Sequence, residues 1–222
     1  TDYETAQVCV RYTDIKGTWE RKTFTSQTDG VNITKIGSSS TGSKVSLALS
    51  IDDISAFANF GNGSEVDLKY KKLVGENCEY IAMAAHYPSY ENSELKDGGY
   101  ATVVYVVCEG GSKTLVEKDA PKESQYCGET DPEIKIKRAD NVYLVAVTGR
   151  THSMGSYEAF AEAESYELVD ELIAKAKAVA EKYTPNGAFN YDAALESHAA
   201  VFSKEYNAVS FKLGETNSTA SN

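Results

Sequence analysis

The chain lacks several features that would assign it to a common functional class. Its longest apolar runs, such as Val103 to Cys108, are far shorter than the roughly 20 residues of a membrane-spanning helix. No basic cluster offsets the formal net charge of -11, and an acidic surface repels phosphate backbones. The chain also has no G-x-S-x-G elbow and no glycine loop of the kind that cradles phosphate. The sequence therefore predicts no membrane span, no nucleic-acid partner and no hydrolase triad.

Few residues of the chain could ligate a metal ion. The four cysteines are Cys9, Cys78, Cys108 and Cys127. They show no CxxC spacing, so a zinc site is not expected, and their three alternative disulfide pairings stay open, with free thiols favoured because a domain of this size needs no covalent staples. The three histidines are His86, His152 and His198. None of them has a second metal-ligating residue of the usual type two to four positions further along the chain, so neither a metal nor a cofactor is predicted.

Residues 1 to about 150 alternate apolar and polar side chains, which is the period of strands half buried in a sheet. The stretch RYTDIKGTWERKTFTS, residues 11 to 26, predicts a hairpin whose turn runs from Asp14 to Gly17. The stretch GGYATVVYVVCEGG, residues 98 to 111, is apolar on both faces and predicts an interior strand. Further strands are expected at 31–36, 45–51, 65–74, 79–87, 134–136 and 142–147. This pattern indicates two antiparallel sheets packed face to face.

The period changes to that of helices at about residue 156. Apolar residues from Tyr166 to Tyr183 lie on one stripe, and TPNG at 184–187 ends that helix. Asn190 or Asp192 can cap a second amphipathic helix. Either both stripes pack on the sheets, or one packs there and the other is available to a partner. A final strand is expected at 209–213.

Several segments resemble, in order and spacing, the N-terminal β domain of glycoside hydrolase family 95, which contains α-L-fucosidases and some α-L-galactosidases. The segments are DYETAQVCVRYTDIKGTWERKTFTSQTDGVNITKI, GGYATVVYVVCEGG, ADNVYLVAVTGRT and HAAVFSKEYNAVSFKLG. The resemblance spans Asp2 to Gly214 and extends more distantly to family 65. No single segment is a chemical motif, so the resemblance rests on their order.

The resemblance implies a mainly β fold, an antiparallel two-sheet supersandwich over residues 1–155. Two linker α-helices and a final strand would follow at 156–214, and a flexible tail at 215–222. The implied partner is a catalytic (α/α)6 barrel of the same bacterial parent chain, which holds the inverting machinery, so no catalytic residue is carried over. The strands that open the family's domain have no counterpart ahead of Thr1, so we expect this sequence to be an internal fragment of its parent chain. No targeting segment is seen, and a secreted and a cytoplasmic parent both stay open.

Two groups of residues are candidates for contact with sugar or with the barrel. Aromatic faces stack on sugar C–H surfaces. The candidates for sugar binding or the barrel rim are Trp19, His86, Tyr87 and Tyr90, the last three in an expected loop from 86 to 99. The candidates for the domain interface are Arg150, His152, His198 and Phe202.

Each group also has a purely structural interpretation. Tyrosine is common in sheets, Trp19 can be core or cross-strand packing, and His198 can be a hydrogen-bonded packing residue. The alternative function is a free-standing carbohydrate-binding module or lectin for fucosylated or galactosylated oligosaccharides.

Overall fold

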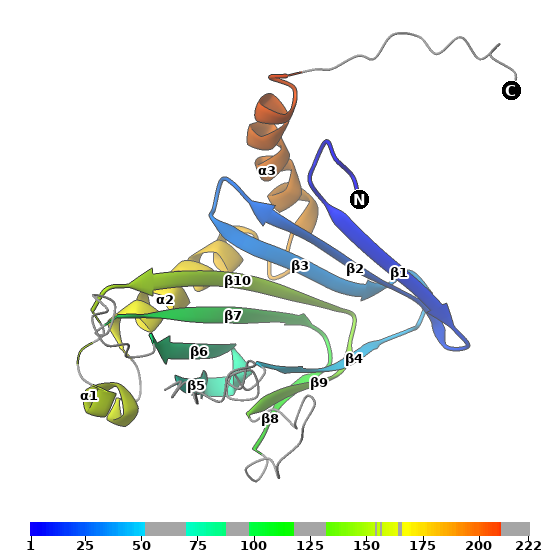
Figure 1. Cartoon of the computed structure of the whole chain (residues 1–222). Coiled ribbons are helices and arrows are strands. Elements are labelled where there is room, and N and C mark those ends of the chain that lie inside the picture. The colour runs from blue at the N-terminus through cyan, green and yellow to red at the C-terminus, as the bar shows by residue number, and fades with distance from the viewer. Residues whose placement is uncertain are drawn as a thin grey trace, which may run out of the picture.

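The computed structural model confirms a mainly β chain with two antiparallel sheets and trailing helices (Figure 1). It describes residues 1–51, 70–87, 98–117, 132–153, 155, 157–163 and 166–209. The larger sheet has seven strands in the order β1-β2-β3-β10-β7-β6-β5, and the smaller has three in the order β4-β9-β8. The strands of the larger sheet are β1 Val8–Asp14, β2 Gly17–Ser26, β3 Val31–Ser38, β10 Asn141–Thr151, β7 Gly99–Glu109, β6 Tyr80–His86 and β5 Tyr70–Val74.

The predicted hairpin is formed by β1 and β2 at one edge of the larger sheet. Asp14 pairs with Gly17, and the Lys16 backbone N–H donates to Asp14 Oδ1 at 2.6 Å within the turn. This register places Tyr12 directly opposite Trp19. Among the described strands, β1 is at the edge of the larger sheet, and every one of its residues is exposed.

The smaller sheet covers part of one face of the larger sheet. It consists of β4 Val45–Ser50, β9 Glu133–Ala139 and β8 Ser112–Val116. The chain passes from β7 to β8 through Gly110 and Gly111, whose φ angles of 67° and 68° are in the left-handed region. A Cβ atom on Gly111 would lie 2.3 Å from the Lys137 carbonyl oxygen, so this crossing requires glycine. Between the sheets, Ile134 and Ile136 pack against strands β7 and β10.

The helices cover the opposite face of the larger sheet. They are α1 Tyr157–Glu162, α2 Glu167–Lys182 and α3 Tyr191–Tyr206. Helix α2 lies along β7 and β10, burying its apolar stripe, and the first half of α3 packs on β2. Strand β7 thus contributes to both cores, with Val103 under the helices and Val106 under the smaller sheet. The prediction of an interior strand is confirmed.

Some elements differ from the sequence-based expectation. The short helix α1 was not expected, and a 3-10 turn, η2 Glu76–Cys78, fills the predicted turn between β5 and β6. Val209 is in a bend, while the rest of the expected final strand, like residues 65–69 and Cys127, lies outside the described residues. The three described cysteines are free thiols.

The turn between β2 and β3 is tied to the end of α2 through Asp29. Its carboxylate accepts hydrogen bonds from Lys182 Nζ at 2.7 Å, Tyr183 OH at 2.8 Å and Ser26 Oγ at 2.9 Å. Burial alone would raise the pKa of Asp29, but these donors outweigh it and the pKa lies below its usual value. Asp29 therefore links the sheet to the helical layer in its ionised form.

This link predicts a pH-dependent loss of stability. A carboxyl whose pKa is depressed in the folded state stabilises above its unfolded pKa of about 3.9, and the contribution is lost as the pH falls through the lower folded pKa. Asp29→Asn should lower the free energy of unfolding by about 1.5–3 kcal/mol at pH 7, and the difference from wild type should shrink below pH 4. Urea unfolding between pH 7 and pH 3 measures both effects. Glu196→Gln, on exposed α3 surface, is the control and should match wild type throughout.

Candidate functional site

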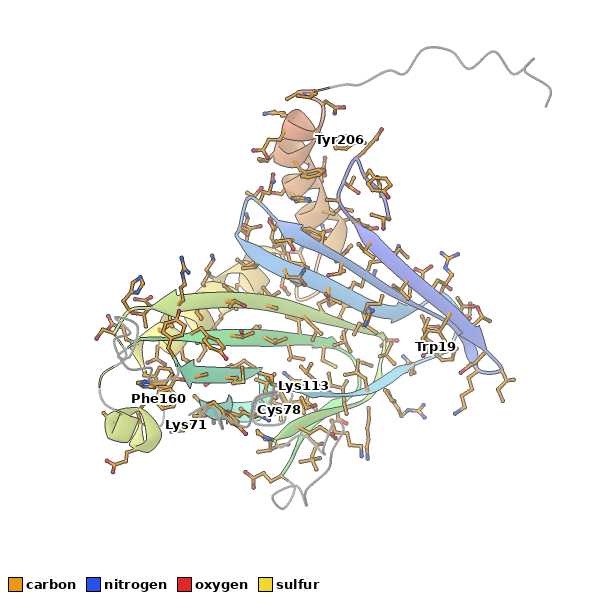
Figure 2. All side chains as sticks on the ribbon, viewed as in Figure 1. Trp19, Lys71, Cys78, Lys113, Phe160 and Tyr206 are labelled. Atoms are coloured by element: carbon orange, nitrogen blue, oxygen red, sulfur yellow. The ribbon has the colours of Figure 1, made fainter. Side chains whose placement is uncertain are left out.

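A cleft of about 350 Å³ lies between the β1–β2 hairpin and strand β4. Its apolar lining comes from both sheets and includes Val10, Ile36 and Leu47, and its aromatic lining is the pair Tyr12 and Trp19. Figure 2 shows Trp19 where the hairpin and β4 approach each other. The volume is within the range of small-ligand sites, about 300–1,000 Å³.

The aromatic pair follows directly from the hairpin register. Tyr12 and Trp19 are cross-strand partners, and their ring centroids are 5.4 Å apart with planes 16° from parallel. Trp19 also packs against the core between the sheets, which fixes its position. Tyr12 keeps 60% of its surface exposed. Trp19 thus has the cross-strand packing role that was one of its two interpretations, and it presents an aromatic surface to the cleft as well.

Two of the residues that line the cleft are charged, Glu20 and Arg21. Glu20 is engaged by two basic residues: Arg11 Nε donates to Glu20 Oε1 at 2.7 Å, and Lys22 Nζ lies 3.6 Å from Glu20 Oε2. The hydrogen bond from Arg11 is the main reason that the pKa of Glu20 is lowered. Arg21 is exposed beside the cleft, and within the described residues no carboxylate pairs with its guanidinium. The cleft therefore has a free cation at its rim.

A second cleft, of about 460 Å³, lies where β10 ends and α2 begins. Arg150 lines it together with Tyr166, the N-cap residue of α2, and with Glu167 and Glu171. Burial raises the pKa of the Tyr166 hydroxyl, so this group stays protonated. Two acidic side chains and one basic one face the same space, so the cleft has no strong preference for an anion.

The other predicted sugar-contact residues do not join the hairpin cleft. His86 lies in the strand expected at 79–87 rather than in the loop expected at 86–99: it is the last residue of β6, 6% exposed, with Phe160 packed edge-on at 4.6 Å. Tyr87 lies beside Tyr100, with ring centroids 6.1 Å apart, and Tyr90 falls outside the described residues. Figure 2 shows Phe160, which packs on His86, far from Trp19, so His86 and Trp19 do not belong to one site.

The predicted interface residues are also dispersed. His152 is exposed just beyond β10. His198 is 1% exposed; its Nδ1 accepts from the Gln27 N–H at 3.3 Å, and its Nε2 lies 3.1 Å from the Thr5 carbonyl oxygen. This geometry supports its interpretation as a packing residue. Phe202 is half-buried one turn further along α3, with its ring 5.3 Å from that of His198.

Two residues of the hairpin cleft, Tyr12 and Arg21, were missed by the sequence analysis. Tyr12 could have been found, because the turn from Asp14 to Gly17 fixes its pairing with Trp19. No sequence signal distinguished Arg21 from other exposed basic residues. Within the described residues, no group of three or more His, Cys, Asp or Glu side chains could hold a metal ion, and no helix is long and apolar enough to span a membrane.

Comparison with known proteins gave only weak structural similarity. No family model matches the chain, and no curated protein matches it in sequence. A solved structure described as "Putative kojibiose phosphorylase from human microbiome" is similar at a TM-score of 0.43 and 10% sequence identity. The match covers 92% of this chain and 22% of that chain. A TM-score below 0.5 supports no conclusion about this chain's activity.

Proposed function

We propose that this chain is a non-catalytic N-terminal domain of a glycoside hydrolase resembling family 95, an inverting α-L-fucosidase or α-L-galactosidase. Its role is to brace and rim a catalytic (α/α)6 barrel of the same parent chain. The support from sequence is the ordered set of segments from Asp2 to Gly214 that resemble this family. The two packed sheets followed by helices agree with the architecture that the resemblance implies.

The main support for the bracing role is that the two halves of α3 differ in burial. In its first half, Tyr191, Ala194 and His198 are buried against the sheet. Its second half extends away from both sheets (Figure 1), and there Tyr206 is 46% exposed and Val209, just beyond the helix, is 81% exposed. Exposed apolar side chains that continue a buried stripe are a typical surface for contact with another domain.

The chemistry of the described residues agrees with a non-catalytic role. Inverting glycosidases need two carboxyl groups about 6.5–9.5 Å apart across a sugar-sized pocket. The hairpin cleft has one carboxylate among its lining residues, Glu20, and this is paired with Arg11 and Lys22. The β10–α2 cleft has Glu167 and Glu171, which lie on consecutive turns of α2. Both carboxylates are therefore on the same wall of the cleft and could not face each other across a substrate.

A charge placed at the end of α3 tests this proposal in the parent enzyme. Tyr206→Asp should leave the unfolding free energy of the isolated chain within about 0.5 kcal/mol of wild type, because the site is exposed there. In the full-length parent it should destabilise the domain contact by about 2 kcal/mol or more, the cost of losing a buried aromatic anchor. Thermal unfolding of both proteins measures the difference.

The matched control is Ala200→Asp, which adds the same charge to an exposed position of α3 away from this stripe and should affect neither protein. Equal melting of the Tyr206→Asp parent and the wild-type parent would exclude α3 as the docking surface. The isolated chain should release no product from fucosyl or galactosyl aryl glycosides. Turnover above the buffer blank would show that the domain is catalytic and the proposal wrong.

A further inference from the structure

We propose that the cleft between the β1–β2 hairpin and β4 binds a carboxylate-bearing sugar, such as a uronate unit of an oligosaccharide. The aromatic pair Tyr12 and Trp19 would contact the sugar ring, and Arg21 would bind its carboxylate. This inference goes beyond the proposed function and does not depend on it, because a bracing domain needs no ligand.

The shape and lining of the cleft fit one or two sugar rings. A pyranose has an apolar C–H face and a rim of hydroxyl groups, so it matches a site with an aromatic surface bordered by hydrogen-bonding groups. Tyr12 and Trp19 supply the aromatic surface, and the lining residues Tyr12, Arg21 and Ser46 carry hydrogen-bonding groups. Trp19 is held by the core, so the site is preformed and its ordering cost on binding is small.

The charge of the hairpin selects an acidic ligand. The whole chain has 33 acidic and 22 basic residues, but the hairpin from 8 to 26 has four basic and two acidic residues. Glu20 also lines the cleft, but its carboxylate is paired with Arg11 and Lys22, whereas Arg21 has no carboxylate partner among the described residues. A guanidinium presents a planar fork of donors that matches a carboxylate, and the resulting hydrogen bonds are charge-assisted.

The chain provides its own probe for this site, because Trp19 is its single tryptophan. Titration with a galacturonic acid trimer should change the Trp19 fluorescence saturably in the millimolar range or below. Raising the salt concentration should weaken binding, since an exposed ion pair is screened. A neutral galactose trimer of the same length should bind about tenfold more weakly or worse, because it lacks the charge-assisted hydrogen bond.

Three variants separate the contributions of the ring and the charge. Arg21→Gln should weaken binding of the uronate trimer by about tenfold or more and leave binding of the neutral trimer unchanged. Lys16→Gln makes the same charge change at the hairpin turn, outside the cleft lining, and should bind as wild type. Tyr12→Ala should weaken both sugars by about threefold to tenfold through the lost ring contact. Circular dichroism checks that each variant is folded.

Several outcomes would overturn the proposal. One is the absence of a saturable change in Trp19 emission up to about 10 mM uronate trimer, which covers the millimolar range expected for the site. Another is equal affinity for the acidic and neutral trimers. Equal weakening by Arg21→Gln and Lys16→Gln would show attraction to the overall charge of the hairpin rather than a site. An emission change on concentrating the protein without sugar, together with dimers in sedimentation, would show that a second copy pairs with β1 and fills the cleft.

Discussion

Phe24→Ala is expected to lower the free energy of unfolding by about 3–5 kcal/mol, the range found for removal of a buried aromatic ring. Phe24 lies on β2 and is 2% exposed. Its ring packs edge-on against Tyr191 at 5.4 Å and is stacked on His198 at 5.3 Å. Removing it leaves a cavity beneath the first half of α3, so the contact between α3 and the sheet should weaken most. Urea denaturation followed by circular dichroism gives the size of the loss.

The control for Phe24 is Phe202→Ala, which removes the same ring from a half-buried position further along α3. In the isolated chain this variant should cost much less, about 1 kcal/mol, because its ring is already partly hydrated. Hydrogen exchange should show faster exchange of the α3 amides in Phe24→Ala than of those in β7. Similar losses from the two variants would mean that Phe24 does not anchor α3.

Glu109→Ala is expected to cost about 2–4 kcal/mol, because several partly buried donors lose their acceptor together. Glu109 ends β7, and its carboxylate accepts from Asn141 Nδ2 at 2.8 Å, Tyr143 OH at 3.2 Å and the Phe189 N–H at 3.0 Å. The loop between α2 and α3 is thereby held to the sheet. Burial and, secondarily, the negative charge of Glu109 raise the pKa of Tyr143, so this hydroxyl remains a donor.

Two further variants make the Glu109 prediction specific. Glu109→Gln retains an acceptor oxygen and the shape of the side chain, so it should recover at least half of the loss. Glu181→Ala, on the exposed face of α2, removes a charge of the same sign and should change stability by less than about 0.5 kcal/mol. If Glu109→Ala is as stable as Glu181→Ala, the three hydrogen bonds do not hold the loop.

Local patterns were sufficient to predict most of the strands and both long helices. The hairpin, the interior strand β7 and the helix α3 capped by Asn190 were each set by residues close together in the chain, and the structure confirms them. Asn190 Oδ1 accepts the Ala193 N–H at 3.0 Å, one of the two capping options. Periodicity and capping are local properties, so a single sequence can display them.

The arrangement of the elements could not be predicted, because it depends on contacts between distant residues. Nothing local indicates that β10 inserts between β3 and β7, or that β4 leaves the larger sheet for the smaller one. The partners of His198, Thr5 and Gln27, are likewise remote in sequence. Predicting the hairpin cleft would have required both local and long-range information. The local register pairs Tyr12 with Trp19, whereas the wall formed by β4 depends on how distant strands pack.

The central position of β10 has a consequence for biosynthesis. Residues 141–146 pair with β3 on one side, and residues 141–151 pair with β7 on the other. The described strands of the larger sheet therefore form two separate pieces until β10 has left the ribosome. During that interval both pieces present unpaired edges, which are sites of aggregation. We therefore expect the nascent chain to depend on chaperones until β10 emerges and joins the two pieces.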